Sequence, residues 1–223
     1  MSPRLLFPHA PAAADALTFA QRAGRAGDGA VRLRAEGGVL AMTASVLAAD
    51  GLLDDTPTIL AMRFLPVDPE LVCDLVVTAD ALTPGDEPTW VGLPEAAVTA
   101  SWAGISPPRS GWEPAGEVAA ATLAARAQWG IAAVAEAVPT DAGAEAVQAV
   151  RAHVWGVPDD ALLGLPRGVA FAAFALGFIG GEETAAVRRC GPWTRLSLAR
   201  GHVITRETSR VGMTAVRTTG RSA

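Results

Sequence analysis

The sequence predicts an α+β fold: an N-terminal antiparallel sheet or partial barrel, a helical middle and a C-terminal β-hairpin. Three observations support this class. Apolar residues alternate with polar ones before residue 103, they recur at helical spacing after residue 117, and short β-like runs return after Gly180-Gly181. We therefore divide the 223 residues into an N-terminal helix with an antiparallel sheet (1–103), a Trp- and Pro-rich connection (104–116), a helical region with the C-terminal hairpin (117–207) and a basic flexible tail (208–223).

The N-terminal region contains the clearest local signal. A helix is expected from Ala12 to Ala26, with Pro11 at its start. It is followed by Gly37-Gly38, a two-residue hairpin turn between alternating strands. One register satisfies both strands, because it places Val31, Leu33, Ala35, Leu40, Met42 and Ala44 on one face and Arg32 and Arg34 on the other.

The remaining elements follow from the same spacing rules. The run 169–179 is apolar on every side, so we expect a buried helix in which Phe174→Ala costs about 3–5 kcal/mol. The other helices are expected at 117–138 and 141–155. Strands are expected at 58–65, 71–79 and about 96–102, and then at 184–190, 193–198 and 202–207.

Composition excludes several kinds of chemistry. Half of the residues are hydrophobic and 18% are charged, which is typical of a folded chain. Lys and Asn are absent and all eighteen basic residues are Arg, so a Schiff-base lysine, a P-loop lysine and N-glycosylation are excluded. The three His residues lack metal-binding spacing, and no Gly-x-Ser-x-Gly motif occurs. We expect no metal, no cofactor and no identifiable catalytic residue.

Charge is distributed unevenly along the chain. Residues 35–184 contain five Arg and twenty acids, a balance of −15, whereas residues 185–223 contain eight Arg and one acid, a balance of +7. The first 34 residues have a balance of +3, which completes the net charge of −5. A basic tail beside an acidic body either binds an acidic partner or folds back on its own body.

The two cysteines and the apolar runs indicate where the protein resides. Cys73 and Cys190 are 117 positions apart, and we expect free thiols, because Pro8 and His9 interrupt the apolar N-terminus and argue against an export signal. The late charge-free run, 168–181, has fourteen residues and is too short to span a bilayer. We therefore expect a soluble, cytoplasmic protein without a membrane partner.

Two stretches rich in Trp and Arg supply the candidate site. The first, TASWAGISPPRSGWEPAG, surrounds the connection, and its indole rings are expected to be docked rather than loose. The second, WTRLSLARGHVITRE, is the densest polar stretch of the chain and suits an anion such as a phosphate or a carboxylate. The candidate ligand-binding residues are Trp102, Arg109, Trp112, Trp193, Arg195 and His202.

Both stretches also have a structural interpretation. The late Arg residues suit an edge hairpin, where charge keeps the edge soluble and unpaired. Arg109 follows Pro107-Pro108, in a segment with few backbone states, and suits a pair with Asp or Glu or a stack on Trp. We favour the structural interpretation for both, and expect Arg109→Lys to lower stability because Lys lacks the planar fork.

Nucleic-acid binding is the least favoured interpretation. Two helices followed by an Arg-rich hairpin suggest a winged helix-turn-helix, but the helix before the hairpin reads VAFAAFALGFI. A recognition helix must present polar and basic side chains to the bases and phosphates, and this one has none. Binding through the C-terminal Arg residues alone is expected to be weak and steeply salt-dependent.

Four stretches are distinctive as a set: SWAGISPPRSGWEP, RAHVWG, AFAAFALGFIGG and WTRLSLARGHV. Together they are similar to a conserved, uncharacterised protein family of actinobacteria, over most of the chain from the first hairpin to about Glu207. The resemblance implies no activity, no cofactor and no catalytic residues.

The leading hypothesis is therefore a non-catalytic intracellular interaction or regulatory protein, whose partner is another protein or an acidic ligand. The first alternative is a small anionic-ligand-binding protein or enzyme with a Trp/Arg/His-lined pocket. The second alternative is weak nucleic-acid binding through the basic C-terminus. Whether Arg109, Arg195 and His202 converge on one pocket separates the first two hypotheses.

Overall fold

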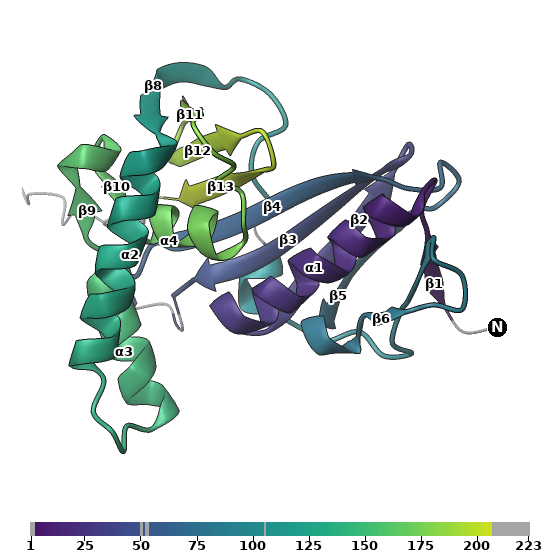
Figure 1. Ribbon diagram of the computed structural model, residues 1–223, viewed down its shortest axis with the longest axis horizontal. Coiled ribbons are helices and arrows are strands. Elements are labelled where there is room, and N and C mark those ends of the chain that lie inside the picture. The colour runs from purple at the N-terminus through teal and green to yellow at the C-terminus, as the bar shows by residue number, and fades with distance from the viewer. Residues whose placement is uncertain (1–2, 50, 52–53, 105, 207–223) are drawn as a thin grey trace, which may run out of the picture.

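The computed structural model describes residues 3–49, 51, 54–104 and 106–206. The predicted basic tail, 208–223, lies outside the described residues. Within them, an antiparallel sheet of eight strands forms the centre, with α-helices packed against one face (Figure 1). Its strands, in spatial order, are β5 (Cys73–Thr78), β2 (Ala30–Glu36), β3 (Val39–Leu47), β4 (Thr58–Pro66), β13 (Gly201–Arg206), β12 (Trp193–Leu198), β11 (Thr184–Cys190) and β8 (Glu113–Ala119).

The first hairpin forms in the register that the sequence predicts. Leu33 lies opposite Met42, and both side chains are fully buried. Gly37 and Gly38 have φ angles of +59° and +80°, which a two-residue turn between right-twisted strands requires and which Gly adopts without strain. Arg32 and Arg34 lie on the other face and point away from the helices, so the predicted register is confirmed.

The two halves of the chain share one sheet. β4 from the first half pairs with β13 from the second, with Ala61 opposite Val203. Outward from this pair the strands run β4, β3, β2 on one side and β13, β12, β11 on the other, so each half contributes three consecutive strands. The predicted N-terminal sheet and C-terminal hairpin are therefore one antiparallel sheet, and the hairpin is a three-strand meander extended by β8.

The helices pack on one face of this sheet. α1 (Ala10–Ala26) lies over β2, β3 and β4, and His9 caps it by accepting from the Ala12 amide at 3.2 Å. α4 (Gly168–Ala175) lies over β3, β4 and β13. α2 (Ala120–Ala137) packs on α4 and α3 (Ala144–Trp155), and the α2–α3 pair projects beyond the sheet (Figure 1).

Gly130 explains how α2 and α3 pack so closely. A Cβ at this position would lie 2.1 Å from the Trp155 ring, so only Gly leaves room for the indole. Trp155 in turn stacks on Phe171 of α4 with ring centroids 4.6 Å apart. A residue that weakens the isolated helix thus stabilises the contact between three helices.

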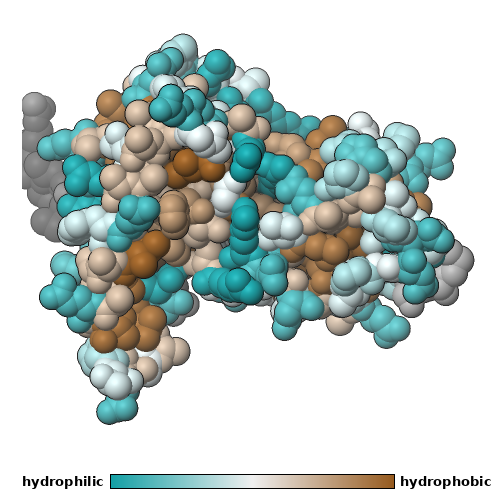
Figure 2. All heavy atoms as spheres, viewed as in Figure 1, coloured by the Kyte–Doolittle hydropathy of each residue, from teal (hydrophilic) through white to brown (hydrophobic). Residues whose placement is uncertain are grey.

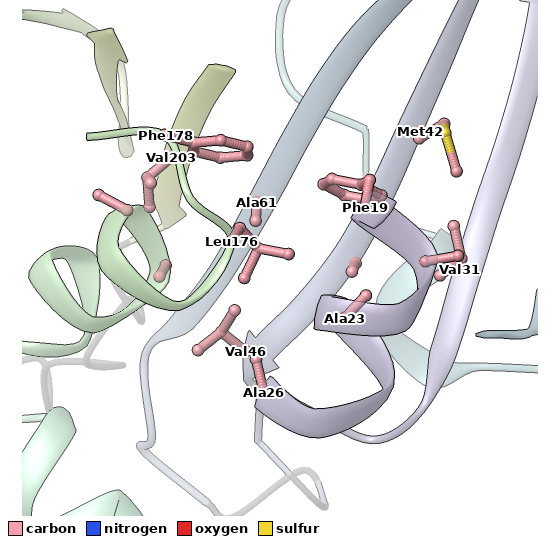
Figure 3. Close-up of a cluster of buried hydrophobic side chains, with 14 of the residues drawn as sticks. Phe19, Ala23, Ala26, Val31, Met42, Val46, Ala61, Leu176, Phe178 and Val203 are labelled. Carbon is pink, nitrogen blue, oxygen red and sulfur yellow. The ribbon is translucent and has the colours of Figure 1, made fainter. Parts of the chain in front are cut away.

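A single hydrophobic core joins the helices to the sheet. Side chains from α1, the segment after α4 and strands of both halves meet in it (Figure 3). Phe19 of α1 stacks on Phe178 with ring centroids 6.3 Å apart. Because the core contains residues from both sides of the connection, the two halves bury apolar surface against each other.

Short strands complete the described structure. β1 (Arg4–Leu6), β7 (Trp90–Gly92) and β6 (Thr83–Pro84) form a small sheet, and β9 (Pro158–Asp159) pairs with β10 (Leu165–Pro166). The 3-10 helices are Ala79–Ala81, Ser101–Gly104 and Asp160–Leu162. Cys73 and Cys190 are free thiols, as predicted. None of the helices in the described residues is both long and apolar enough to cross a bilayer.

Two element predictions on either side of the connection are wrong. Residues 117–119 were expected in a helix but belong to β8, because Val118 pairs with Ala185 of β11 and this ladder overrides the helical pattern. The strand expected at about 96–102 does not form. The Val98 amide donates to Val76 at 2.8 Å, and the chain then turns into the 3-10 helix that contains Trp102.

The third predicted helix is shorter and less uniformly buried than its sequence indicates. It ends at Ala175, and Gly177 adopts a φ of +71° that turns the chain back toward the core. Leu176 and Phe178 are therefore buried beyond the helix, whereas Phe174 is 39% exposed. The expected loss of about 3–5 kcal/mol from Phe174→Ala is wrong for this residue and applies instead to Phe178.

Candidate functional site

The face of the sheet opposite the helices carries a different set of side chains. We call it the helix-free face; it presents Arg32, Arg34, Glu36, Leu60, Met62, Phe64, Arg195, His202 and Ile204. These residues alternate along their strands with the buried core residues. Residues 102 and 106–112 lie against this face and enclose with it a cavity of about 360 Å³. The part of the cavity wall that this segment contributes consists of Trp102, Ser106, Pro107, Pro108, Arg109 and Trp112.

Trp102 and Trp112 hold the segment of residues 102 and 106–112 in place over the cavity. The Trp102 ring is 3% exposed, and its Nε1 donates to the Asp28 carboxylate at 2.6 Å. Trp112 Nε1 donates to the Pro108 carbonyl at 2.9 Å, which closes a tight loop around Arg109. The predicted docking of both indole rings is confirmed, because each indole N–H has a partner inside the protein.

Arg32, on β2, attaches residues 103 and 106 to the sheet by hydrogen bonds. Its Nε and Nη2 each donate to Asp74 at 2.7 Å, and Nη1 donates to the Ala103 carbonyl at 2.7 Å and to Ser106 Oγ at 3.3 Å. The hydrogen-bonded Arg32 guanidinium lowers the pKa of Asp74, and Asp74 in turn raises the pKa of Arg32. Arg32 is thus fully engaged by the protein itself.

Arg109 combines both interpretations that the sequence allows. Its Nη2 lies 3.3 Å from Glu36, which also lies 3.9 Å from Arg34. The predicted pairing of Arg109 with a carboxylate is therefore present. However, the side chain is 73% exposed, so the pair is screened by water, and the same guanidinium lines the cavity.

Arg195 is the residue of the site without a counter-ion. Its guanidinium lies over Trp112 at 4.7 Å from the ring centroid, and among the described residues no carboxylate lies within ion-pair distance of it. Its Nε is buried and has no hydrogen-bond partner there. Burial and the repulsion of Arg188, directly opposite on β11, both lower the pKa of Arg195.

His202 lies beside this cation as a neutral ring. Burial and the nearby Arg195 charge lower the pKa of His202 from its usual 6.5. Its Nδ1 is 3.0 Å from Ser197 Oγ, and its ring meets Phe64 edge-on with centroids 5.5 Å apart. Ser197 does not line the cavity in the described structure, so this hydrogen bond orients the imidazole rather than supplying a nucleophile there.

Five of the six candidate residues line one cavity, and Trp193 does not. Trp193 is on the helix-free face two residues before Arg195, but Arg206 lies over its ring at 5.7 Å and it is not part of the cavity wall. The sequence also left Arg32, Arg34 and Phe64 out of the site. The hairpin register had already placed Arg32 and Arg34 on this face, but nothing local indicated that β2 and β12 share a sheet.

Other features of the described surface are less specific than this cavity. In the described residues, no group of three or more His, Cys, Asp and Glu side chains is arranged to hold a metal ion. Apolar side chains lie along the projecting α2–α3 pair (Figure 2), and Ile131 of α2 is 40% exposed. The cavity on the opposite face is more specific, because it combines apolar walls, indole rings and an uncompensated guanidinium.

Solved structures with a similar chain path include DNA polymerase sliding clamps. One from Caulobacter crescentus is 14% identical, with a TM-score of 0.49 over 99% of this chain and 70% of the clamp. One from Bartonella birtlesii, bound to griselimycin, is 12% identical, with a TM-score of 0.49 over 91% and 64%. A putative DNA polymerase III β subunit of Eubacterium rectale is 7% identical, with a TM-score of 0.48 over 92% and 64%. Similarity at this level carries no information about activity.

Sequence comparisons divide the chain near the connection. No curated protein sequence matches it. Residues 1–104 match the model of a domain of unknown function (DUF8010), and residues 107–210 match that of another (DUF8185). Each half of the chain is therefore similar to a different domain of unknown function.

Proposed function

We propose that this protein is a non-catalytic binding protein, which holds an anionic ligand with an apolar body between the helix-free face and residues 102 and 106–112. The observation that carries the proposal is Arg195. Arg195 lines the cavity, its Nε is covered by protein atoms and has no hydrogen-bond partner in the described structure, and no carboxylate there neutralises the guanidinium. A partly buried cation without a counter-ion is stabilised by an anion that enters the cavity.

The charges around the cavity support the same conclusion. Four guanidinium groups line it, from Arg32, Arg34, Arg109 and Arg195. Asp74 neutralises the first, and Glu36 is shared between the next two, so two positive charges remain among the described groups. His202 adds none at neutral pH, because its pKa is lowered. The cavity is therefore electropositive although the chain as a whole is acidic.

The indole rings argue against single-stranded nucleic acid as the ligand. Binding of successive bases needs several open aromatic faces, but among the described residues only two indole rings line the cavity: Trp102 is 3% exposed, and Trp112 already has the Arg195 guanidinium over one face. The favoured ligand is instead a small anion or an acidic group on a partner protein.

The actinobacterial origin and the cytoplasmic location of the protein both stay predictions from the sequence.

The test is a titration with 8-anilino-1-naphthalenesulfonate, an anion with an apolar body whose fluorescence rises in apolar sites. We expect saturable binding to the wild type and about tenfold weaker binding to Arg195→Gln, which corresponds to about 1.4 kcal/mol. The matched control is Arg189→Gln, an exposed Arg on β11 that does not line the cavity. Equal affinity of the wild type and Arg195→Gln would reject the proposal.

A further inference from the structure

We infer that the ligand of this cavity is a monocarboxylate with an apolar body, rather than a phosphate ester. This inference rests on the proposed function, because it names the chemical class of the anion that the same cavity holds. Three features carry it: the kind of donors that face the cavity, their number, and the apolar surface beside them.

The backbone offers the ligand no donors from the sheet. β2, β3, β4, β13 and β12 are all interior strands, each paired on both sides, so their amides are used in the ladders. No residue of the α-helices lines the cavity among the described residues, so no helix N-terminus points into it. Phosphate sites are commonly built from such free amides, and this cavity has neither source.

The side chains offer one partly buried guanidinium without a counter-ion. Arg32 is engaged by Asp74, Ala103 and Ser106, while Arg34 and Arg109 share Glu36 in water-exposed positions. Arg195 alone is both uncompensated and partly buried among the described Arg residues that line the cavity. One guanidinium fork matches the two oxygens of one carboxylate, whereas a phosphate presents three strong acceptor oxygens and needs further donors.

The surface next to Arg195 is apolar. Leu60, Met62, Phe64 and Ile204 line the cavity from β4 and β13, together with the Trp112 ring. Because Leu60 and Ile204 are only 1% and 3% exposed, the accessible apolar surface comes chiefly from Met62, Phe64 and Trp112. A volume of about 360 Å³ suits a small molecule with one fused ring system or a short alkyl chain.

The experiment compares three ligands that share one apolar body: 2-naphthoate, 2-naphthyl phosphate and 2-naphthol. Calorimetric titration of the full chain measures each Kd at pH 7.5. We expect 2-naphthoate to bind at least about tenfold more tightly than either other ligand. Arg195→Gln removes this advantage, whereas Arg189→Gln keeps it. Decanoate, measured in parallel, shows whether a chain serves as well as a ring.

Each outcome separates this inference from the function on which it rests. If 2-naphthyl phosphate binds more tightly than 2-naphthoate, and loses affinity in Arg195→Gln, the anion site stands and the carboxylate assignment fails. If 2-naphthol binds as tightly as 2-naphthoate, anion recognition itself fails. Absence of binding by 2-naphthoate and decanoate overturns the inference, even where the sulfonate probe binds.

Discussion

The two faces of the central sheet are built from the same strands but differ in what they do. On β13, Val203 points into the helix-covered core, and the next residue, Ile204, points into the cavity. On β3, Met42 is fully buried under the helices, whereas Ala41 lines the cavity. One face is closed by densely packed helices, and the other is covered by a segment held by a few hydrogen bonds.

This difference shows where stability and binding are separated in the molecule. The helix-covered face buries mainly apolar side chains, with Thr194 and Thr205 among its few polar ones, so its residues stabilise the fold chiefly through packing. The helix-free face keeps a buried apolar strip under a cavity and places an unpaired cation beside it. A polar or charged site with incomplete pairing costs stability and is expected where a ligand completes it. The following predictions test this separation.

The largest effect is expected on the helix-covered face. Phe178→Ala should lower the free energy of unfolding by about 3–5 kcal/mol, because Phe178 is 1% exposed and stacks on Phe19. Chemical denaturation followed by circular dichroism measures the change. Phe174→Ala, on the exposed side of α4, is the control and should cost less than about 1 kcal/mol. Equal losses in the two variants would contradict the packing described here.

A smaller loss of stability is expected at Arg32, which attaches residues 103 and 106 to the helix-free face. Arg32→Gln should cost about 1–2 kcal/mol, because it breaks the contacts to Asp74 and to Ala103. The same denaturation experiment measures it. Arg34→Gln, whose ion pair is longer and exposed, should change stability by less than about 0.5 kcal/mol. If Arg32→Gln were as mild as this control, the attachment would not depend on Arg32.

The pH dependence of stability reports on His202. Its pKa is lowered in the folded protein, so below about pH 6.5 the unfolded chain binds a proton that the folded chain resists. The contribution of His202 to the free energy of unfolding is therefore complete above about pH 6.5 and is lost as the pH falls toward the pKa of the folded state. Unfolding measured between pH 5 and 8 should show a shallower acid loss in His202→Gln. An unchanged slope would mean that His202 titrates as an exposed imidazole does.

The smallest effect on stability is expected from Arg195→Gln, the variant that most impairs binding. Losing the contact with Trp112 costs about 0.5–1 kcal/mol, but removing a partly buried cation opposite Arg188 offsets it. The net change should lie within about 0.5 kcal/mol. A loss above about 1.5 kcal/mol would show that Arg195 stabilises the fold, and its role as an anion site would lose its main support.

The sequence by itself determined the local elements and their faces. The register of the first hairpin is correct because side chains alternate every two residues and only one register buries both apolar sets. Strands 184–190 and 193–198 form at the predicted residues, because Gly191 and Pro192 separate two alternating runs. Arg109, Arg195 and His202 were also recognisable as candidates, since such side chains beside Trp suit an anion.

Only the tertiary structure decided which of these elements meet. The pairing of β4 with β13 joins segments far apart in the sequence, and no local spacing records it. That pairing brings Arg195 and His202 to the face where Arg32 and Arg34 already lie. The pairing of β8 with β11 likewise turns residues 117–119 into a strand, and the packing of α4 leaves Phe174 exposed. Local patterns fix the face on which a side chain lies, whereas long-range pairing and packing fix its neighbours, and the cavity depends on those neighbours.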